Sequence, residues 1–323
     1  SNGQLRGITR EENGRKTFHW FVANPINSYG VNINIGDYVH FSEIYQGEKG
    51  PLKCDYYVLS YNLEKAKKQF AQATKMLEAF EHWFGPYPFY EDGYKLVEAP
   101  YLGMEHQSSV TYGNGFENGY RGRDLSHSGW GLKFDFIIIH ESAHEWFANN
   151  ITYADMADFW IHESFTCYSE SLFVEYYYGK DAGAEYVRGV RANTENKYPL
   201  QGTYGVADGG RSGTDIYYKG ANMWHMLRQI VDDDDQWRAL LRDLNKTFYH
   251  QTVLAEDIEG FFDQRITTDL TSIFDQYVRD ARIPVLSYRI DQGKLQYRYD
   301  NVVEGFEMPL RIWIDGEARW LVD

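Results

Sequence analysis

The sequence predicts an α+β protein in which a mainly helical region is flanked by β-structure on both sides. Three observations lead to this prediction. Short alternating segments fill residues 18–60, helical spacing dominates from residue 62 to about residue 282, and strand-like alternation returns after Pro284. With 323 residues, 43% of them hydrophobic, the chain is long enough for two compact domains or for one domain with parts of others.

The N-terminal strands are predicted from alternating apolar and polar positions. "GVNINIG" at residues 30–36 and "YVHFSEI" at residues 38–44 both show this pattern, with Gly, Asn and Pro between the segments. We therefore interpret residues 1–56 as the C-terminal remnant of an N-terminal β-domain. The first three residues, "SNG", resemble the residues left after a purification tag is removed. We therefore expect the natural N-terminus to be missing, so that the sequence does not indicate the cellular compartment.

A first helix is predicted after Asn62, which is a plausible N-cap, and before the stop signal Gly85-Pro86. Its apolar residues recur at helical spacing: Leu63, Ala66, Phe70, Ala73, Leu77 and Phe80. The following segment, "YKLVEAPYLGMEHQSSVTYG" at residues 94–113, again has the pattern of strands.

Several further helices are predicted in the second half of the chain. Residues 133–150 are apolar almost all round, which indicates a buried helix. A helix over residues 159–178 is stopped by a glycine, and a glycine-rich loop at 205–215 leads to another helix at 216–231. Further helical patterns extend to about Arg282.

Two hairpins are predicted after Pro284. "VLSYRIDQGKLQYRYD" forms the first, and "RIWIDGEARWLV" forms the second with Asp315-Gly316 at the turn. A strand-like run reaches Asp323, and a domain would not normally end on such a bare edge. We therefore expect residues 283–323 to be the start of a β-sandwich domain, and the chain to be a fragment cut at both ends.

The net charge of −15 argues against nucleic acid or an anionic membrane as a partner and favours cationic ligands, including the amino terminus of a peptide. No apolar run approaches the ~20 residues of a membrane helix, so no membrane segment is expected in this fragment. The two cysteines, Cys54 and Cys167, are interpreted as free thiols.

The stretch "HESAH" has the residue types of a zinc site. On a helix, His140 and His144 lie on one face and can bind one ion, while Glu141 lies beside them, near a metal-bound water. Glu163 follows eighteen residues after His144 among apolar neighbours, and a buried carboxylate needs a partner such as a third place on the metal. Glu170, two turns further on, is a candidate acceptor for a histidine N–H. The alternative is a helix with two ordinary histidines and surface glutamates.

"HESAHEWFANNIT" followed by "FWIHESFT" resembles the gluzincin aminopeptidases, the family of aminopeptidase N and leukotriene hydrolase, whose signature is HExxH, eighteen residues and then Glu. "LGMEHQ" resembles the family's GxMEN exopeptidase motif, and "YYKGA" resembles its Tyr-x-Lys-Gly-Ala stretch. The resemblance implies a thermolysin-like, mainly helical catalytic domain with a small mixed sheet over residues 57–282. It also implies one Zn²⁺ per chain and hydrolysis of the N-terminal bond of peptides with a free N-terminus.

The resemblance assigns a role to each matching residue. Glu105 would hold the substrate's ammonium group from an exposed strand edge, and Gly103 and Met104 would align the peptide through main-chain hydrogen bonds. Tyr217, rather than the tyrosine after it, would donate a hydrogen bond to the oxyanion. Glu141 would be the general base. Met104 and nearby aromatic residues suggest an apolar or aromatic first residue in the substrate.

The sequence departs from the family pattern at four positions, none of which supplies a catalytic atom: Leu102, His106, Ala148 and His162. We do not expect His106 or His162 to bind the metal. Two other functions stay open. In a thermolysin-like endopeptidase, Glu105 would have no role in substrate binding. A non-catalytic binding module would keep the aminopeptidase fold without catalysing a reaction.

Overall fold

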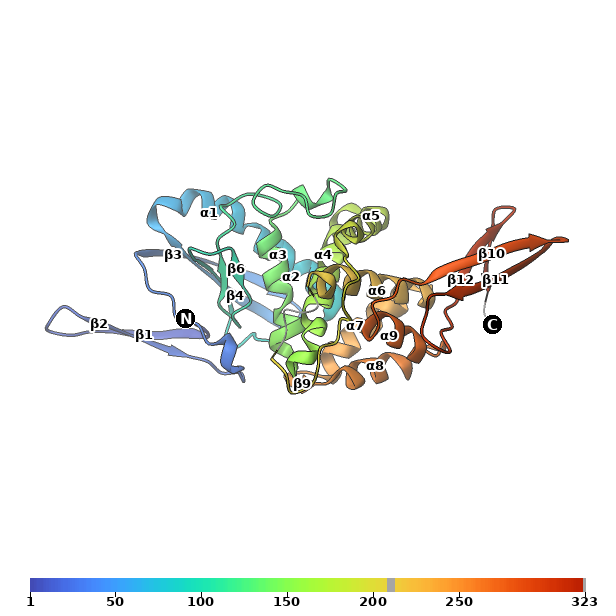
Figure 1. The fold of residues 1–323 in the computed structure, drawn as a ribbon. Coiled ribbons are helices and arrows are strands. Elements are labelled where there is room, and N and C mark those ends of the chain that lie inside the picture. The colour runs from blue at the N-terminus through green and yellow to red at the C-terminus, as the bar shows by residue number, and fades with distance from the viewer. Residues whose placement is uncertain (208–212, 322–323) are drawn as a thin grey trace.

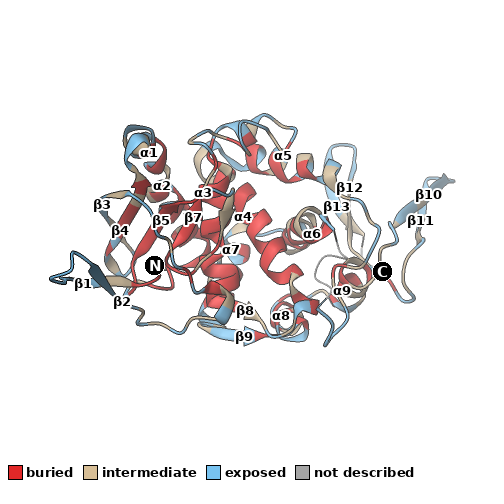
Figure 2. Cartoon of the chain, turned by 60° about the vertical axis from the view of Figure 1, so that its left-hand side comes forward, coloured by how far each residue is buried: buried red, intermediate tan, exposed pale blue. Residues whose placement is uncertain are grey.

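The computed structural model describes residues 1–207 and 213–321 and has a helical body with β-structure at both ends (Figure 1). The hairpin β1–β2 projects from one end, and the hairpin β10–β11 projects from the other. Buried residues concentrate in the helices and in the sheet beside them, whereas the hairpins are largely exposed (Figure 2). The predicted α+β class is confirmed.

A mixed five-stranded sheet, in the order β3-β4-β5-β7-β6, packs against the helices. β4, β5 and β7 run parallel, and the outer strands β3 and β6 are antiparallel to their neighbours. β6 lies at the edge of the sheet and packs beside α3. The strands are β3 (Tyr38–Gly47), β4 (Gly50–Leu59), β5 (Tyr94–Glu98), β6 (Gly103–Met104) and β7 (Val110–Tyr112). The predicted domain boundary between residues 56 and 57 falls inside β4 and stays a prediction.

The helix α4 forms the centre of the body, because α3, α5 and α6 all pack against it. Every residue from Trp160 to Val174 is buried, so this helix is enclosed on all sides. The helices are α1 (Leu63–Phe70), α2 (Gln72–Phe84), α3 (Phe136–Ala143), α4 (Trp160–Tyr178), α5 (Lys180–Val190), α6 (Asp215–Val231), α7 (Asp234–Thr247), α8 (Ala255–Asp263) and α9 (Thr271–Val278). None of the helices in the described residues is long and apolar enough to cross a membrane.

The remaining strands form two-stranded units. β8 and β9 pair in parallel, and the others form antiparallel hairpins. Both C-terminal hairpins are confirmed, and positive φ values at Asp315 and Gly316 provide the two-residue turn of the last one. The strands are β1 (Gln4–Arg10), β2 (Lys16–Phe21), β8 (Ile151–Tyr153), β9 (Gln251–Val253), β10 (Val285–Asp291), β11 (Lys294–Asp300), β12 (Leu310–Ile314) and β13 (Glu317–Leu321).

Three sequence predictions near the N-terminus and in the helices are wrong in detail. Residues 30–36 form an irregular connection rather than a strand, and the Asn2 side chain bonds the carbonyl of Gly30 and the N–H of Asn32. The first helix is broken at Ala71 into α1 and α2, and Asn62 does not cap it because its amide donates to Glu98 Oε1 at 2.6 Å. α5 was not predicted, since Gly183 and its neighbours weaken the helical pattern.

The helix predicted over residues 133–150 is regular only in α3. Asp135 caps it, with Oδ1 accepting hydrogen bonds from the N–H groups of Ile137 and Ile138. From Glu145 to Asn150 the chain follows a wider π-helical turn, with non-helical backbone angles at Phe147. The glycine-rich loop at 205–215 is described only in part, because residues 208–212 lie outside the described residues.

Candidate metal centre and active site

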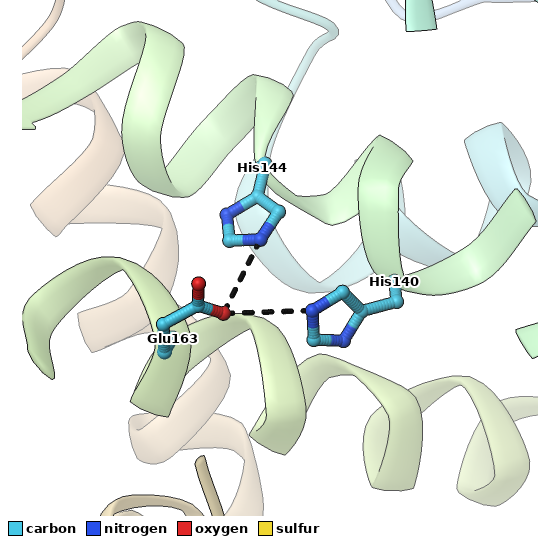
Figure 3. A group of neighbouring side chains, drawn as sticks. All are labelled: His140, His144 and Glu163. Carbon is cyan, nitrogen blue, oxygen red and sulfur yellow. Dashed lines mark ion pairs between the residues drawn. The ribbon is translucent and has the colours of Figure 1, made fainter. Parts of the chain in front are cut away.

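His140 and His144 lie one turn apart at the end of α3, both buried, and their Nε2 atoms face Glu163 of α4 (Figure 3). His140 Nε2 is 3.5 Å and His144 Nε2 is 3.4 Å from Glu163 Oε2. The three ligand atoms lie within 4.8 Å of one another. The predicted return of Glu163 over the two imidazoles is therefore present in the fold.

These donors fit a zinc ion. Tetrahedral Zn²⁺ with bonds of ~2.0–2.2 Å separates neighbouring ligand atoms by about 3.3 to 3.6 Å, close to both observed distances. Glu163 Oε2 is buried and accepts no hydrogen bond of good geometry from any residue that the structure describes. A buried carboxylate oxygen without a partner is costly, and a cation at this point removes that cost.

The opposite ring nitrogens of both histidines are held by hydrogen bonds. His140 Nδ1 lies 2.7 Å from Glu170 Oε1, as predicted, and the other oxygen of Glu170 accepts from the Tyr186 hydroxyl at 2.5 Å. His144 Nδ1 lies 3.0 Å from the carbonyl oxygen of Phe147. Because a carboxylate and a carbonyl can only accept, both Nδ1 atoms donate and both Nε2 lone pairs remain for the metal.

A second group of donors lies directly beside the first. One side-chain oxygen each from Glu105 and Glu141 lies within 4.8 Å of a ring nitrogen of His144 and of each other. Burial raises the pKa of Glu141 to about 7, close to the value that suits proton transfer at neutral pH. The site therefore combines a candidate metal-binding triad, formed by His140, His144 and Glu163, with two further buried carboxylates, those of Glu105 and Glu141.

Residues 68–277 match the family model described as the peptidase family M1 domain. The chain belongs to peptidase family M1. It is 26% identical to aminopeptidase B of Mus musculus over 269 residues, which cover 79% of this chain and 39% of the relative. It is 24% identical to endoplasmic reticulum aminopeptidase 1 of Mus musculus over 272 residues, covering 80% of this chain and 28% of the relative. The chain thus spans less than half the length of these M1 relatives.

Solved M1 structures share the fold. A mutant M1 zinc metallopeptidase from Deinococcus radiodurans, bound to a Tyr-Ser-Ala substrate, matches 88% of this chain and 61% of its own, with a TM-score of 0.73 and 21% identity. Aminopeptidase A of Legionella pneumophila, in complex with aspartic acid, matches 96% of this chain and 36% of its own, with a TM-score of 0.76 and 16% identity. The mainly helical body with a small mixed sheet, which the resemblance implied, agrees with the fold of these structures.

Glu105, which the resemblance assigned to an exopeptidase motif, directly follows the edge strand β6, but it is buried and not exposed as predicted. Its side chain and backbone together are only 7% exposed. The N-terminal segment covers the residues after it, because Asn2 Nδ2 donates to the carbonyl of Gln107 at 2.6 Å and Gln107 Nε2 donates to the carbonyl of Pro25 at 2.8 Å. Burial strengthens the attraction of this carboxylate for a cation by reducing the screening of its charge.

Tyr217 lies on α6 and faces the metal ligands, with its ring centroid 6.0 Å from that of His140. Burial raises the pKa of Tyr217 well above its usual range, and the charge of Glu163 raises it further, so the hydroxyl keeps its proton and can donate. The pKa of the adjacent Tyr218 is raised by burial and then by the nearby Glu170 carboxylate. The two tyrosines therefore have different surroundings, and only Tyr217 faces the ligand set.

The departures from the M1 pattern leave the ligand set intact. Neither His106 nor His162 belongs to either donor group found among residues 1–207 and 213–321. His162 Nε2 accepts a hydrogen bond from the backbone N–H of Tyr153 at 3.0 Å. Thr166, whose hydroxyl lies 3.0 Å from His144 Nδ1, was not predicted, since a single threonine on a helix has no distinguishing pattern.

Replacing Glu170 by glutamine is expected to weaken zinc affinity about 10- to 100-fold, the usual cost of losing a group that orients a ligand. The amide cannot carry the negative charge that holds His140 Nδ1 at 2.7 Å. Competition with a chromogenic zinc chelator measures the change. Unaltered affinity would show that the packing of α3 alone orients the imidazole.

The structure leaves no room for a side chain at Gly103, which the sequence did not reveal. A Cβ atom at this position would lie 2.8 Å from Glu141 Oε1 and 2.8 Å from Ile137 Cγ2. Gly103→Ala is therefore expected to displace the Glu141 carboxylate and lower kcat about 100-fold, the effect of a misplacement of about 1 Å. Zinc content should stay at the wild-type level, because the ligands are untouched. Wild-type kcat in this variant would mean that the carboxylate position is not critical.

Proposed function

We propose that this chain carries the catalytic site of a zinc-dependent aminopeptidase, which hydrolyses the N-terminal peptide bond of peptides with a free N-terminus. One observation carries the proposal: the buried Glu105 lies in the same donor group as Glu141 and His144. A metal hydrolase needs one base beside the metal. A second buried carboxylate at that place suits a cationic group of the substrate, and the α-ammonium is the cation nearest to an N-terminal peptide bond.

His140, His144 and Glu163 would hold one Zn²⁺ per chain, which supplies Lewis-acid polarisation of the scissile carbonyl and a water of lowered pKa. Glu141 accepts the proton of the attacking water and passes it to the leaving amine. Tyr217 donates a hydrogen bond to the carbonyl oxygen as negative charge develops on it. The metal ligands stay fixed during these steps, because Glu170 and the Phe147 carbonyl hold both imidazoles.

Glu105 fixes which bond reaches the metal. Its carboxylate binds the substrate's ammonium group, and the free edge of β6 at Gly103 and Met104 aligns the first residues through main-chain hydrogen bonds. A peptide longer at its N-terminus would have to place an uncharged amide against a buried carboxylate, which is costly. Met104 favours an apolar or aromatic first side chain.

We further propose that residues 57–282 form the catalytic domain, since the M1 match and both donor groups fall within them. Residues 1–56 would belong to an N-terminal β-domain, which contributes the β1–β2 hairpin and β3. Residues 283–323 would begin a β-sandwich with two hairpins.

Metal analysis and a pair of substrates test the proposal. The purified chain is expected to hold one zinc, and to cleave a leucyl anilide about 10- to 100-fold faster than its N-acetyl derivative, the scale of losing a charged hydrogen bond. Preference for the acetylated substrate would identify a thermolysin-like endopeptidase instead. A chain without stoichiometric zinc would contradict both enzymatic functions and favour a binding module.

A further inference from the structure

The π-helical turn Glu145–Asn150 holds the segment that begins with Glu105. Asn149 Nδ2 donates to the carbonyl of Glu105 at 2.8 Å. Glu145 Oε1 accepts from the backbone N–H of Ser108 at 2.7 Å. Both side chains are buried, so water does not compete for either hydrogen bond. The turn therefore holds this segment at its two ends.

The path of the segment depends on such contacts. Ser108 has a left-handed backbone, with a φ of 51°, which few residues other than glycine adopt. A conformation of this kind persists only where the surrounding structure holds it. The Ser108 hydroxyl is held as well, because it accepts from the N–H of Gly3 at 2.9 Å. The position of Glu105 is thus set by hydrogen bonds from other parts of the chain rather than by the local backbone alone.

Asn149 is also bonded to a metal ligand of the proposed site. Its backbone N–H donates to the carbonyl of His144 at 2.9 Å, which is the five-residue step of a π-helix. In a regular α-helix this N–H would bond four residues back, and the side chain would point about 100° away around the helix axis. One residue therefore connects His144, through its backbone, to Glu105, through its side chain.

We propose that Asn149 is a positioning residue, whose amide sets the distance between the Glu105 carboxylate and the metal position and so restricts cleavage to the bond after the first residue. This inference rests on the proposed aminopeptidase function and deepens it. A carboxylate oxygen of Glu105 lies within 4.8 Å of a ring nitrogen of His144. The second carbonyl of an extended peptide lies ~3.3–3.6 Å beyond the first, too far along the chain to reach the metal when the ammonium group is bound at Glu105.

The first test measures binding of the amine without turnover, by calorimetric titration of the zinc-loaded chain with L-tryptophan and with indole-3-propionate, which lacks only the amino group. Asn149→Ala is expected to weaken L-tryptophan binding about tenfold, the scale of one lost hydrogen bond, because Glu105 is no longer held in place. Binding of indole-3-propionate should change less than about twofold, since it has no ammonium group to donate to Glu105. Zinc content should match that of the wild type, because no metal ligand is altered.

The second test measures the choice of substrate. The preference for a leucyl anilide over its N-acetyl derivative, expressed as the ratio of the two kcat/KM values, should fall about tenfold in Asn149→Ala. The fall should come from the substrate with the free amine. A merely structural role of Asn149 would lower both kcat/KM values by the same factor and leave the ratio unchanged.

Asn150→Ala is the matched control for both tests. Asn150 is the next residue of the same turn and is also buried, but its amide donates to Asn245 Oδ1 at 3.2 Å and its oxygen accepts from the N–H of His250 at 2.9 Å. This variant should lose stability, as Asn149→Ala does, yet keep the wild-type ratio for the two ligands and for the two substrates.

Unchanged ratios in Asn149→Ala, or equal losses for both members of each pair, would overturn this inference alone. A loss of zinc would do the same, because Asn149 would then act on His144. If alanine prevents folding, Asn149→Asp makes the same comparison, since it keeps the size of the side chain but offers no N–H to the Glu105 carbonyl. A wild-type chain that shows no preference for the free amine in either test would reject the proposed function itself.

Discussion

Glu141→Ala is expected to lose at least ~100-fold in kcat while keeping its zinc, the scale of removing a general base. The geometry separates the two effects. Glu141 lies in the donor group with Glu105 and His144, but not in the triad whose three ligand atoms surround the metal position. Metal analysis and steady-state kinetics on the same preparation give both quantities.

Glu141→Gln is the sharper form of this experiment. Glutamine keeps the size of the side chain against Gly103 but cannot accept a proton, so it should lose as much activity as alanine. If either variant keeps activity within a few fold of the wild type, another group is the base. If zinc is lost with the carboxylate, Glu141 is a ligand rather than a base.

Glu163→Gln is expected to abolish zinc retention after dialysis and to lower activity by at least ~1,000-fold, since the several kcal/mol that the metal supplies to the transition state are lost. The neutral amide is a poor ligand. Its NH₂ group would also meet the Nε2 atoms of His140 and His144, which lie 3.5 Å and 3.4 Å from the present oxygen.

Thermal unfolding tests whether this variant binds zinc without a measurement of activity. A ligand that binds only the folded state adds about 2.7 kcal/mol at 100 times its Kd, so added zinc should raise the Tm of the metal-free wild type. Glu163→Gln should show no such rise. Glu170→Gln is the matched control on the same helix. It should still bind zinc, so its Tm should rise when the zinc concentration is higher than the wild type needs. Zinc-dependent stabilisation of Glu163→Gln would mean that the metal has a different third ligand.

The sequence alone determined those parts of the site that depend on local spacing. The four-residue interval between His140 and His144 places both on one helix face in any helix. The hairpin turn at Asp315-Gly316 and the stop after Phe84 likewise depend on residues within a few positions of one another. Glu163 could be predicted as well, because its apolar neighbours indicated burial and the resemblance provided the eighteen-residue interval.

Tertiary structure decided the features that join distant parts of the chain. The contact of Gly103 with Glu141 and the covering of the residues after Glu105 by the N-terminal segment each link residues far apart in sequence. The π-helical turn after His144, which brings the Phe147 carbonyl to the imidazole, also replaced a helix that local periodicity favoured. Periodicity indicates which face of a helix or strand is apolar. The contacts between distant residues depend instead on how one element packs on another, and that packing is a property of the whole chain.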